Sequence, residues 1–185
     1  MHIAVYSGSF NPLHIGHLAI LRLLAKRFDG VYLVVSPQNP FKDASGNATA
    51  SGRLQAAREA VARHPELGGK VRVDDIELGM EPPHYTVRTL RALRTREPSN
   101  DFTLIIGADN LESFPHWREH DAILREFGIA VFPRKGYHRG HLKARLMRED
   151  PSYKIELIDA PLVTVSSTEI REALAAGRDA SGLLM

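Results

Sequence analysis

The stretch Gly8-Ser9-Phe10-Asn11-Pro12-Leu13-His14-Ile15-Gly16-His17 directly follows an apolar run, residues 3–6, and precedes an apolar-periodic segment, residues 18–28. The run predicts a β-strand and the periodic segment predicts a helix. Open α/β sheets bind nucleotides at the carboxyl ends of their strands, and unpaired N–H groups at the start of a helix attract phosphate. The stretch therefore predicts a phosphate-binding turn that carries two histidines onto the first turn of a helix.

Within this turn, His14 and His17 stand three residues apart, so we expect them to share one helix face. Gly16 lies between them and removes a side chain where a phosphate would come close. A zinc pair is the competing interpretation, but structural zinc sites usually need four ligands and the chain has no cysteine. A plainer alternative is one capping histidine and one packed histidine, which would leave the grouping of Gly8, Pro12 and Gly16 with the histidines unexplained.

Strand-like and helix-like segments alternate along the whole chain. This alternation predicts a Rossmann-like open α/β fold, with a mostly parallel sheet and helices on both faces, and one domain over residues 1–185. The expected strands cover residues 3–6, 31–36, 102–106, 129–132 and 155–158, and the expected helices cover residues 18–28, 53–63, 87–93 and 167–176.

Composition narrows the function class. The excess of 24 Lys and Arg over 22 Asp and Glu is too small to indicate nucleic-acid binding, and it suits a site for phosphorylated small molecules. The chain shows no signal peptide, and no apolar run approaches the ~18 residues of a membrane span. We therefore expect a cytoplasmic protein with no nucleic-acid or membrane partner, and a homo-oligomer is compatible with the sequence.

Two common phosphate motifs are missing. The chain contains neither G-x-x-x-x-G-K-[ST] nor G-x-G-x-x-G, so it is predicted to be neither a P-loop protein nor an ordinary dinucleotide binder.

Two segments are expected to be loops. Residues 37–52 form a long polar segment, either a lid or a tolerated insertion. Residues 134–141 form a basic run, for which a solvated charged loop is the favoured interpretation over a dedicated site.

A second motif, Val165-Ser166-Ser167-Thr168-Glu169-Ile170-Arg171, opens the last predicted helix. Ser166 and Glu169 have the spacing of a capping box, which explains part of it. Capping alone requires neither Ser167, Thr168 nor Arg171, and the guanidinium of Arg171 could make a forked contact with phosphate. Together with the histidine turn, this motif predicts a triphosphate site at one edge of the sheet.

With these two motifs, the chain resembles the nucleotidyltransferase superfamily that carries the HxGH motif. Within it, the chain is most similar to bacterial nicotinate-nucleotide adenylyltransferases, from residue 3 to about residue 177. The middle segments that support this are Gly107-Ala108-Asp109-Asn110-Leu111, Phe114-Pro115-His116-Trp117 and Tyr85-Thr86-Val87. The resemblance implies adenylyl transfer from ATP to nicotinate mononucleotide, giving deamido-NAD and pyrophosphate, with Mg²⁺ accompanying ATP and no dedicated metal site.

The resemblance also implies a role for particular residues. The catalytic group would contain His14, His17 and Arg171. The mononucleotide would contact Thr86, which suits the nicotinate carboxylate, Asp109, which accepts from ribose hydroxyls, and Trp117, which stacks on the pyridinium ring. A cap of the following helix is a further role expected for Asp109. The ATP-binding residues would be Gly8, Ser9, Phe10, Gly16, Lys42, Gly107, Ser167 and Thr168.

Alternatives remain at this point. A sister enzyme would transfer adenylate to the amide mononucleotide or to phosphopantetheine, and a nucleotide-binding regulator would keep the pocket without catalysis. The chain departs from the family pattern at Arg88, where family members often have an acid, and at Arg118, where many have an aromatic residue.

Overall fold

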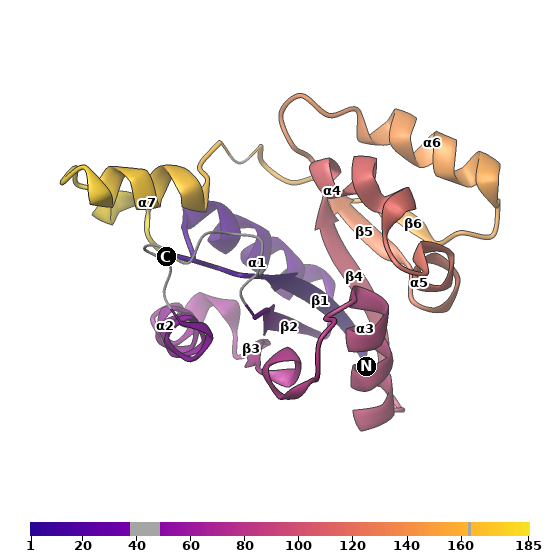
Figure 1. Ribbon diagram of the computed structural model, residues 1–185, viewed down its shortest axis with the longest axis horizontal. Helices are drawn as coiled ribbons and strands as arrows, with labels where there is room; N and C mark the ends of the chain where they lie inside the picture. The colour runs from indigo at the N-terminus through magenta and orange to yellow at the C-terminus, as the bar shows by residue number, and fades with distance from the viewer. Residues whose placement is uncertain (38–48, 163) are drawn as a thin grey trace.

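The computed structural model describes residues 1–37, 49–162 and 164–185, and it contains a six-stranded parallel sheet (Figure 1). The strands are β1 (His2–Gly8), β2 (Gly30–Val35), β3 (Val71–Asp74), β4 (Asp101–Gly107), β5 (Ile129–Phe132) and β6 (Ile155–Leu157). The α-helices are α1 (Ile15–Arg27), α2 (Ala50–Ala62), α3 (Thr86–Arg96), α4 (Ala108–Ser113), α5 (His120–Glu126), α6 (Arg139–Glu149) and α7 (Ser167–Ala175). The predicted Rossmann-like fold is confirmed.

The strand order is β3-β2-β1-β4-β5-β6, so the chain reverses its direction of travel across the sheet between β1 and β4. Ile3 of β1 aligns with Gly30 of β2 on one side and with Phe102 of β4 on the other. Such a reversal opens a crevice beyond the carboxyl ends of the two strands, where open sheets bind ligands. The histidine turn leaves β1 at this crevice, and β4 ends beside it.

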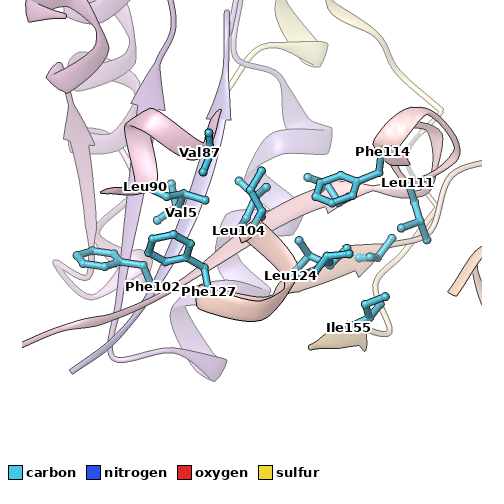
Figure 2. Close-up of a cluster of buried hydrophobic side chains, with 14 of the residues drawn as sticks. Val5, Val87, Leu90, Phe102, Leu104, Leu111, Phe114, Leu124, Phe127 and Ile155 are labelled. Atoms are coloured by element: carbon cyan, nitrogen blue, oxygen red, sulfur yellow. The ribbon is translucent and has the colours of Figure 1, made fainter. Parts of the chain in front are cut away.

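The sheet separates two hydrophobic cores, because side chains alternate between its faces. Ile3 and Val5 of β1 pack with α3, α4, α5 and α6, as Figure 2 shows for Val5, Leu90 and Leu124 and their neighbours. Ala4 and Tyr6 pack on the other face with α1 and α2. Helices therefore cover both faces, as the sequence predicts, and β1 packs against helices on each face.

The structure also differs from the sequence predictions. The strand β3 and the helices α5 and α6 were not predicted, and α4 was expected only as the helix that Asp109 would cap. The solvated loop predicted over residues 134–141 is wrong in its second half, because Arg139 begins α6 and donates to the carbonyl oxygen of Val131 at 2.9 Å. Most of the predicted loop over residues 37–52 lies outside the described residues, and its last part belongs to α2. Within the described ranges, no helix has the length and apolar character needed to span a bilayer.

Candidate active site

A cavity of about 420 Å³ lies at the crevice between the ends of β1 and β4. The predicted site residues that line it are Gly8, Ser9, Phe10, His17, Thr86, Gly107, Asp109, Trp117 and Ser167. The remaining predicted residues lie around it. His14 is buried at the start of α1, and Gly16 is buried in its first turn, while Thr168 and Arg171 lie on α7. Lys42 lies outside the described residues.

The two histidines cap α1 together. His14 is the N-cap residue, and its Nδ1 accepts from the backbone N–H groups of Gly16 at 3.0 Å and His17 at 3.4 Å. The Nδ1 of His17 accepts in return from the backbone N–H of His14 at 3.1 Å. The rings stack with their centroids 3.7 Å apart. The capping alternative is thus correct for His14, which precedes the helix instead of lying on its first turn, but His17 also accepts a backbone bond and does not only pack.

This pairing fixes which nitrogen carries the proton in each ring. A neutral imidazole has one N–H donor and one acceptor, and both Nδ1 atoms act as acceptors here. Each neutral ring therefore carries its hydrogen on Nε2. Burial lowers the pKa of His14 to about 4, helped by the nearby charge of Arg134. Burial, with His14 and Arg134 close by, lowers the pKa of His17 to about 3. The site offers two neutral N–H donors at neutral pH.

These lowered pKa values predict how stability depends on pH. The unfolded chain binds protons at histidine as the pH falls below about 6.5, whereas the folded protein keeps both rings neutral to about pH 4. Stability contributed by the neutral rings is therefore complete above pH 6.5 and is lost as the pH falls toward 4. We expect the free energy of unfolding of the nucleotide-free protein to fall by roughly 2–4 kcal/mol between pH 6.5 and 4.5, the lower figure allowing for solvent screening of the rings, measured by urea denaturation.

A matched variant tests the origin of this loss. Asparagine is among the best N-cap residues and does not titrate, so His14→Asn keeps the cap and removes one of the two proton sites. We expect this variant to match the parent at pH 7.5 and to lose less stability on acidification. The exposed His116→Asn serves as the control. An unchanged pH slope in His14→Asn would contradict the assignment.

The start of α7 joins the histidine turn from the far end of the chain, and Figure 1 shows α7 beside the segment that enters α1. Ser166 and Glu169 form the predicted capping box. The hydroxyl of Ser167 donates to the carbonyl oxygen of Pro12 at 2.9 Å, and the guanidinium of Arg171 donates to that of Asn11 at 2.5 Å. A second guanidinium nitrogen of Arg171 bonds the hydroxyl of Thr168 at 3.1 Å. The two motifs therefore meet at one place, as the sequence predicts.

At the end of β4, the space beside Gly107 is already filled by neighbouring side chains. A Cβ there would lie 2.5 Å from Asp109 Oδ1 and 3.0 Å from the ring of Phe132. The helix-capping role predicted for Asp109 is wrong, because Gly107 is the N-cap of α4 and Asp109 lies in its first turn without a capping hydrogen bond. The carboxylate faces Arg134 instead, with 3.6 Å between Oδ1 and Nε.

Asp109 and Arg134 also leave polar atoms unsatisfied. Among the described residues, Asp109 Oδ1 and Arg134 Nε are buried and make no hydrogen bond. Buried polar groups without a hydrogen bond are uncommon in folded proteins and mark sites where a ligand or water completes the bonding. Both residues line the cavity, and the pair therefore places a carboxylate and a guanidinium at its wall.

The lining of the cavity also contains Thr86 and Trp117. Thr86 is the first residue of α3, where the N–H groups of the first turn have no partner within the helix. Trp117 is half-buried and packs on Phe114, with ring centroids 4.9 Å apart. An aromatic plane and a helix start therefore face the same space as the histidine turn.

The two residues that depart from the family pattern lie outside the cavity lining. Arg88 donates to the carbonyl oxygens of Glu81, at 3.0 Å, and Pro83, and so holds the segment before α3. Arg118 is exposed, and its guanidinium lies 5.6 Å from the centre of the Tyr85 ring. Neither side chain contributes directly to the cavity wall.

Sequence reasoning missed Arg134, which lines the cavity, and it also missed Ser7, Ser36 and Asn110. Arg134 follows β5 immediately, as Phe132-Pro133-Arg134, and a strand end beside the crevice is the signal that could have identified it. Its guanidinium lies 5.5 Å from the centre of the Phe132 ring and is turned inward, in contrast with the exposed Lys135.

A family model described as cytidylyltransferase-like matches residues 5–173 of the chain. The chain belongs to the cytidylyltransferase-like family. It is 38% identical over 177 residues to a probable nicotinate-nucleotide adenylyltransferase of Bacteroides fragilis, covering 95% of this chain and 83% of the relative. It is 36% identical over 186 residues to a protein of the same description from Flavobacterium johnsoniae, covering 100% of this chain and 92% of the relative.

Solved structures agree on the fold of this family member. A Plasmodium falciparum nicotinic acid mononucleotide adenylyltransferase complexed with NaAD superposes with a TM-score of 0.80 at 19% identity, covering 97% of this chain and 87% of that one. A putative nicotinate-nucleotide adenylyltransferase from Vibrio parahaemolyticus gives a TM-score of 0.67 at 22% identity, covering 100% and 93%. The family assignment makes the chain a nucleotidyltransferase, which suits a cavity at the nucleotide-binding edge of the sheet.

Proposed function

We propose that the protein transfers adenylate from ATP to nicotinate mononucleotide, forming deamido-NAD and pyrophosphate. The observation that carries this proposal is the convergence of the histidine turn, the start of α7 and the pair Thr86 and Trp117 around one cavity. The first two groups suit a chain of phosphates. The third suits a flat ring that carries a carboxylate, which is the acceptor named for the curated relatives.

The chemistry requires positioning and charge stabilisation more than proton transfer. An ionised phosphate oxygen of the mononucleotide attacks the α-phosphorus of ATP, a new P–O–P bond forms, and pyrophosphate leaves with the bonding electrons. The attacking oxygen needs no general base. Catalysis then depends on holding two anions in line and on donors aimed at the developing negative charge.

The neutral histidine pair supplies such donors. The Nε2–H groups of His14 and His17 donate to ATP phosphate oxygens, and their tautomers are fixed beforehand by the capping bonds. Arg171, Ser167 and Thr168 meet the phosphates from the α7 side. Arg134 adds a positive charge to the cavity wall. Two imidazolium rings stacked this closely would repel each other, so the neutral form is the one that the pair can maintain.

The acceptor end is recognised by donors and a ring. Unpaired N–H groups at the start of α3 and the hydroxyl of Thr86 donate to the nicotinate carboxylate. The amide analogue brings its own N–H donors, which find no acceptor in this set, so the acid is favoured. Asp109, which lines the cavity, accepts from ribose hydroxyls through its carboxylate.

Magnesium fits this cavity as a companion of ATP. Among the described residues that line it, Asp109 is the one carboxylate. Mg²⁺ is typically held by one or two carboxylates together with substrate phosphates and water. The described residues contain no cluster of metal ligands, so ATP phosphate oxygens and water would hold the ion, which would supply charge neutralisation on the leaving pyrophosphate.

A substrate panel tests the proposed reaction. The purified protein is given Mg-ATP with nicotinate mononucleotide, the amide mononucleotide or phosphopantetheine, and pyrophosphate release is followed. We expect the highest kcat/KM with the acid mononucleotide. Preference for either of the other acceptors would refute the acceptor assignment, and binding of ATP without turnover on any acceptor would favour a nucleotide-binding regulator.

Trp117 allows a separate test of the acceptor subsite. A pyridinium ring on the indole contributes about 1–2 kcal/mol, so we expect Trp117→Ala to raise KM for the mononucleotide roughly tenfold. KM for ATP should stay within about twofold of the parent value in Trp117→Ala. Two controls should keep both KM values within about twofold: Trp117→Phe, which retains an aromatic ring, and Tyr137→Ala, at an exposed aromatic residue. Because Trp117 is the only tryptophan, mononucleotide binding should also quench the fluorescence of the parent. Equal weakening of both substrates would contradict the stacking role.

A further inference from the structure

The carbonyl oxygens of the histidine turn are held by donors from distant parts of the chain. Between Ser9 and Leu13, four carbonyl groups accept such bonds. These bonds join Arg53 to Ser9 O at 2.7 Å, Arg171 to Asn11 O at 2.5 Å, Ser167 to Pro12 O at 2.9 Å, and the backbone N–H of Met185 to Leu13 O at 3.3 Å. The turn is therefore oriented by side chains from α2 and α7 and by the segment 181–185.

Arg53 is the buried member of this group, with 3% of its surface exposed. One guanidinium nitrogen, Nη1, donates both to Ser9 O and to the carbonyl oxygen of Ser36, at 2.8 Å. The backbone N–H of Ser36 in turn donates to Gly8 O at 2.9 Å. Burying a charged guanidinium is costly unless it is hydrogen-bonded, so this placement reflects a specific requirement of the turn.

The bond to Ser9 also determines where the next amide points. The carbonyl of Ser9 and the N–H of Phe10 belong to one planar trans peptide and point in opposite directions. Ser9, Phe10 and Ser36 line the main cavity, whereas Arg53 is not among its lining residues. The Phe10 N–H therefore points away from Arg53.

Phe10 needs such support, because its φ of 47° lies in the left-handed region. A bulky residue in that region is strained and persists only where its surroundings hold it. The Phe10 ring is buried, with its centroid 5.4 Å from that of Tyr6. Packing holds the side chain, and Arg53 holds the peptide that precedes it.

We propose that Arg53 is a positioning residue for the reaction, which keeps the Phe10 amide aimed at a phosphoryl group in the cavity. This rests on the proposed function, in which phosphates occupy that space. Arg53 itself does not touch the substrate. It acts by holding the Ser9 carbonyl away from the cavity, so that a donor and not an acceptor faces the anion.

Kinetics of Arg53→Met test this role against a matched control. A misplaced donor at the reacting centre lowers kcat, and we expect a loss of about 30-fold with both KM values within about threefold of the parent. Arg58→Met removes an arginine from the same helix, where Arg58 is exposed and faces Asp75 at 3.7 Å, and should leave kcat unchanged. Arg53→Lys restores a charged nitrogen donor and should recover kcat to within about fivefold. A merely structural role would instead lower kcat in proportion to the folded fraction, without this rescue.

A measurement on the parent covers the case in which Arg53→Met does not fold. In the ¹⁵N-labelled parent, inorganic pyrophosphate should shift the Phe10 amide resonance, and in Arg53→Lys the shift should persist. A Phe10 amide that does not respond in the parent would overturn the proposal, as would equal kcat values for Arg53→Met and Arg58→Met. Absence of turnover on every acceptor, with the Phe10 response intact, would refute the proposed reaction while leaving the role of Arg53 in place.

Discussion

Replacing His17 by asparagine should lower kcat by roughly 10²–10³-fold, because it removes an N–H donor aimed at a phosphate that gains charge in the transition state. The amide oxygen of asparagine can still accept from the backbone N–H of His14, the bond that Nδ1 of His17 makes now. We therefore expect the free energy of unfolding to change by no more than about 1 kcal/mol. Steady-state pyrophosphate release and urea unfolding at pH 7.5 measure the two effects.

The control is His64→Asn, since His64 pairs with Glu66 after α2 and does not line the cavity. The pH dependence adds a second discriminating observation. The lowered pKa of His17 keeps the ring neutral, so kcat/KM of the parent should show no histidine titration between pH 6 and 8. A loss of kcat/KM as the pH rises through 6.5 would mean that a protonated imidazole is required and would contradict this mechanism.

The sequence was sufficient to predict the centre of the sheet because its strands are buried on both faces. All six residues of β2 are buried, and such continuous apolar runs are easily recognised. The missed strand β3 is different. It is four residues long at the edge of the sheet and carries the exposed Arg72 and the buried Asp74. Asp74 is paired with Arg96 at 2.6 Å, a partner that only the folded chain reveals.

The helix α6 was missed for a similar reason. Leu146 is its one buried residue in the described structure, so the segment lacks the apolar stripe from which helices are predicted. Its first residue, Arg139, is held by the carbonyl oxygens of Val131 and Ile158. Tertiary contacts, and not local periodicity, define where this helix begins.

At the site, sequence patterns predicted which residues gather but not how they bond. The spacing of His14 and His17 indicates proximity, whereas the reciprocal capping that fixes both tautomers depends on backbone geometry at the start of α1. Arg53 lies in an alanine- and arginine-rich segment that resembles an exposed helix surface. Its burial follows from the packing of α2 against the turn, and no pattern in the sequence distinguishes it from Arg58.

Arg134→Met should lower kcat/KM by about 10²-fold, since it removes a positive charge from the wall of a cavity that binds several negative ones. Lys135→Met, at the next and exposed residue, should leave kcat/KM within about twofold of the parent. The solvated-loop interpretation of residues 134–141 predicts no difference between the two variants. Steady-state kinetics with saturating and limiting ATP measure the effect.

Arg134→Met should also make the free energy of unfolding less dependent on pH, through its effect on the two histidines. The charge of Arg134 helps to lower the pKa of both rings, so its removal raises each folded-state pKa toward the value in the unfolded chain. The difference in histidine pKa between the folded and unfolded states shrinks, and less stability is lost as the pH falls from 6.5 toward 4.

Arg134→Lys separates the effect on kcat/KM from the effect on pH dependence, because lysine keeps the charge but not the planar fork. We expect this variant to retain the pH slope of the parent and to recover only part of kcat/KM. Full recovery of kcat/KM would show that charge alone matters at this position, and a shallow slope in Arg134→Lys would show that the charge does not reach the histidines.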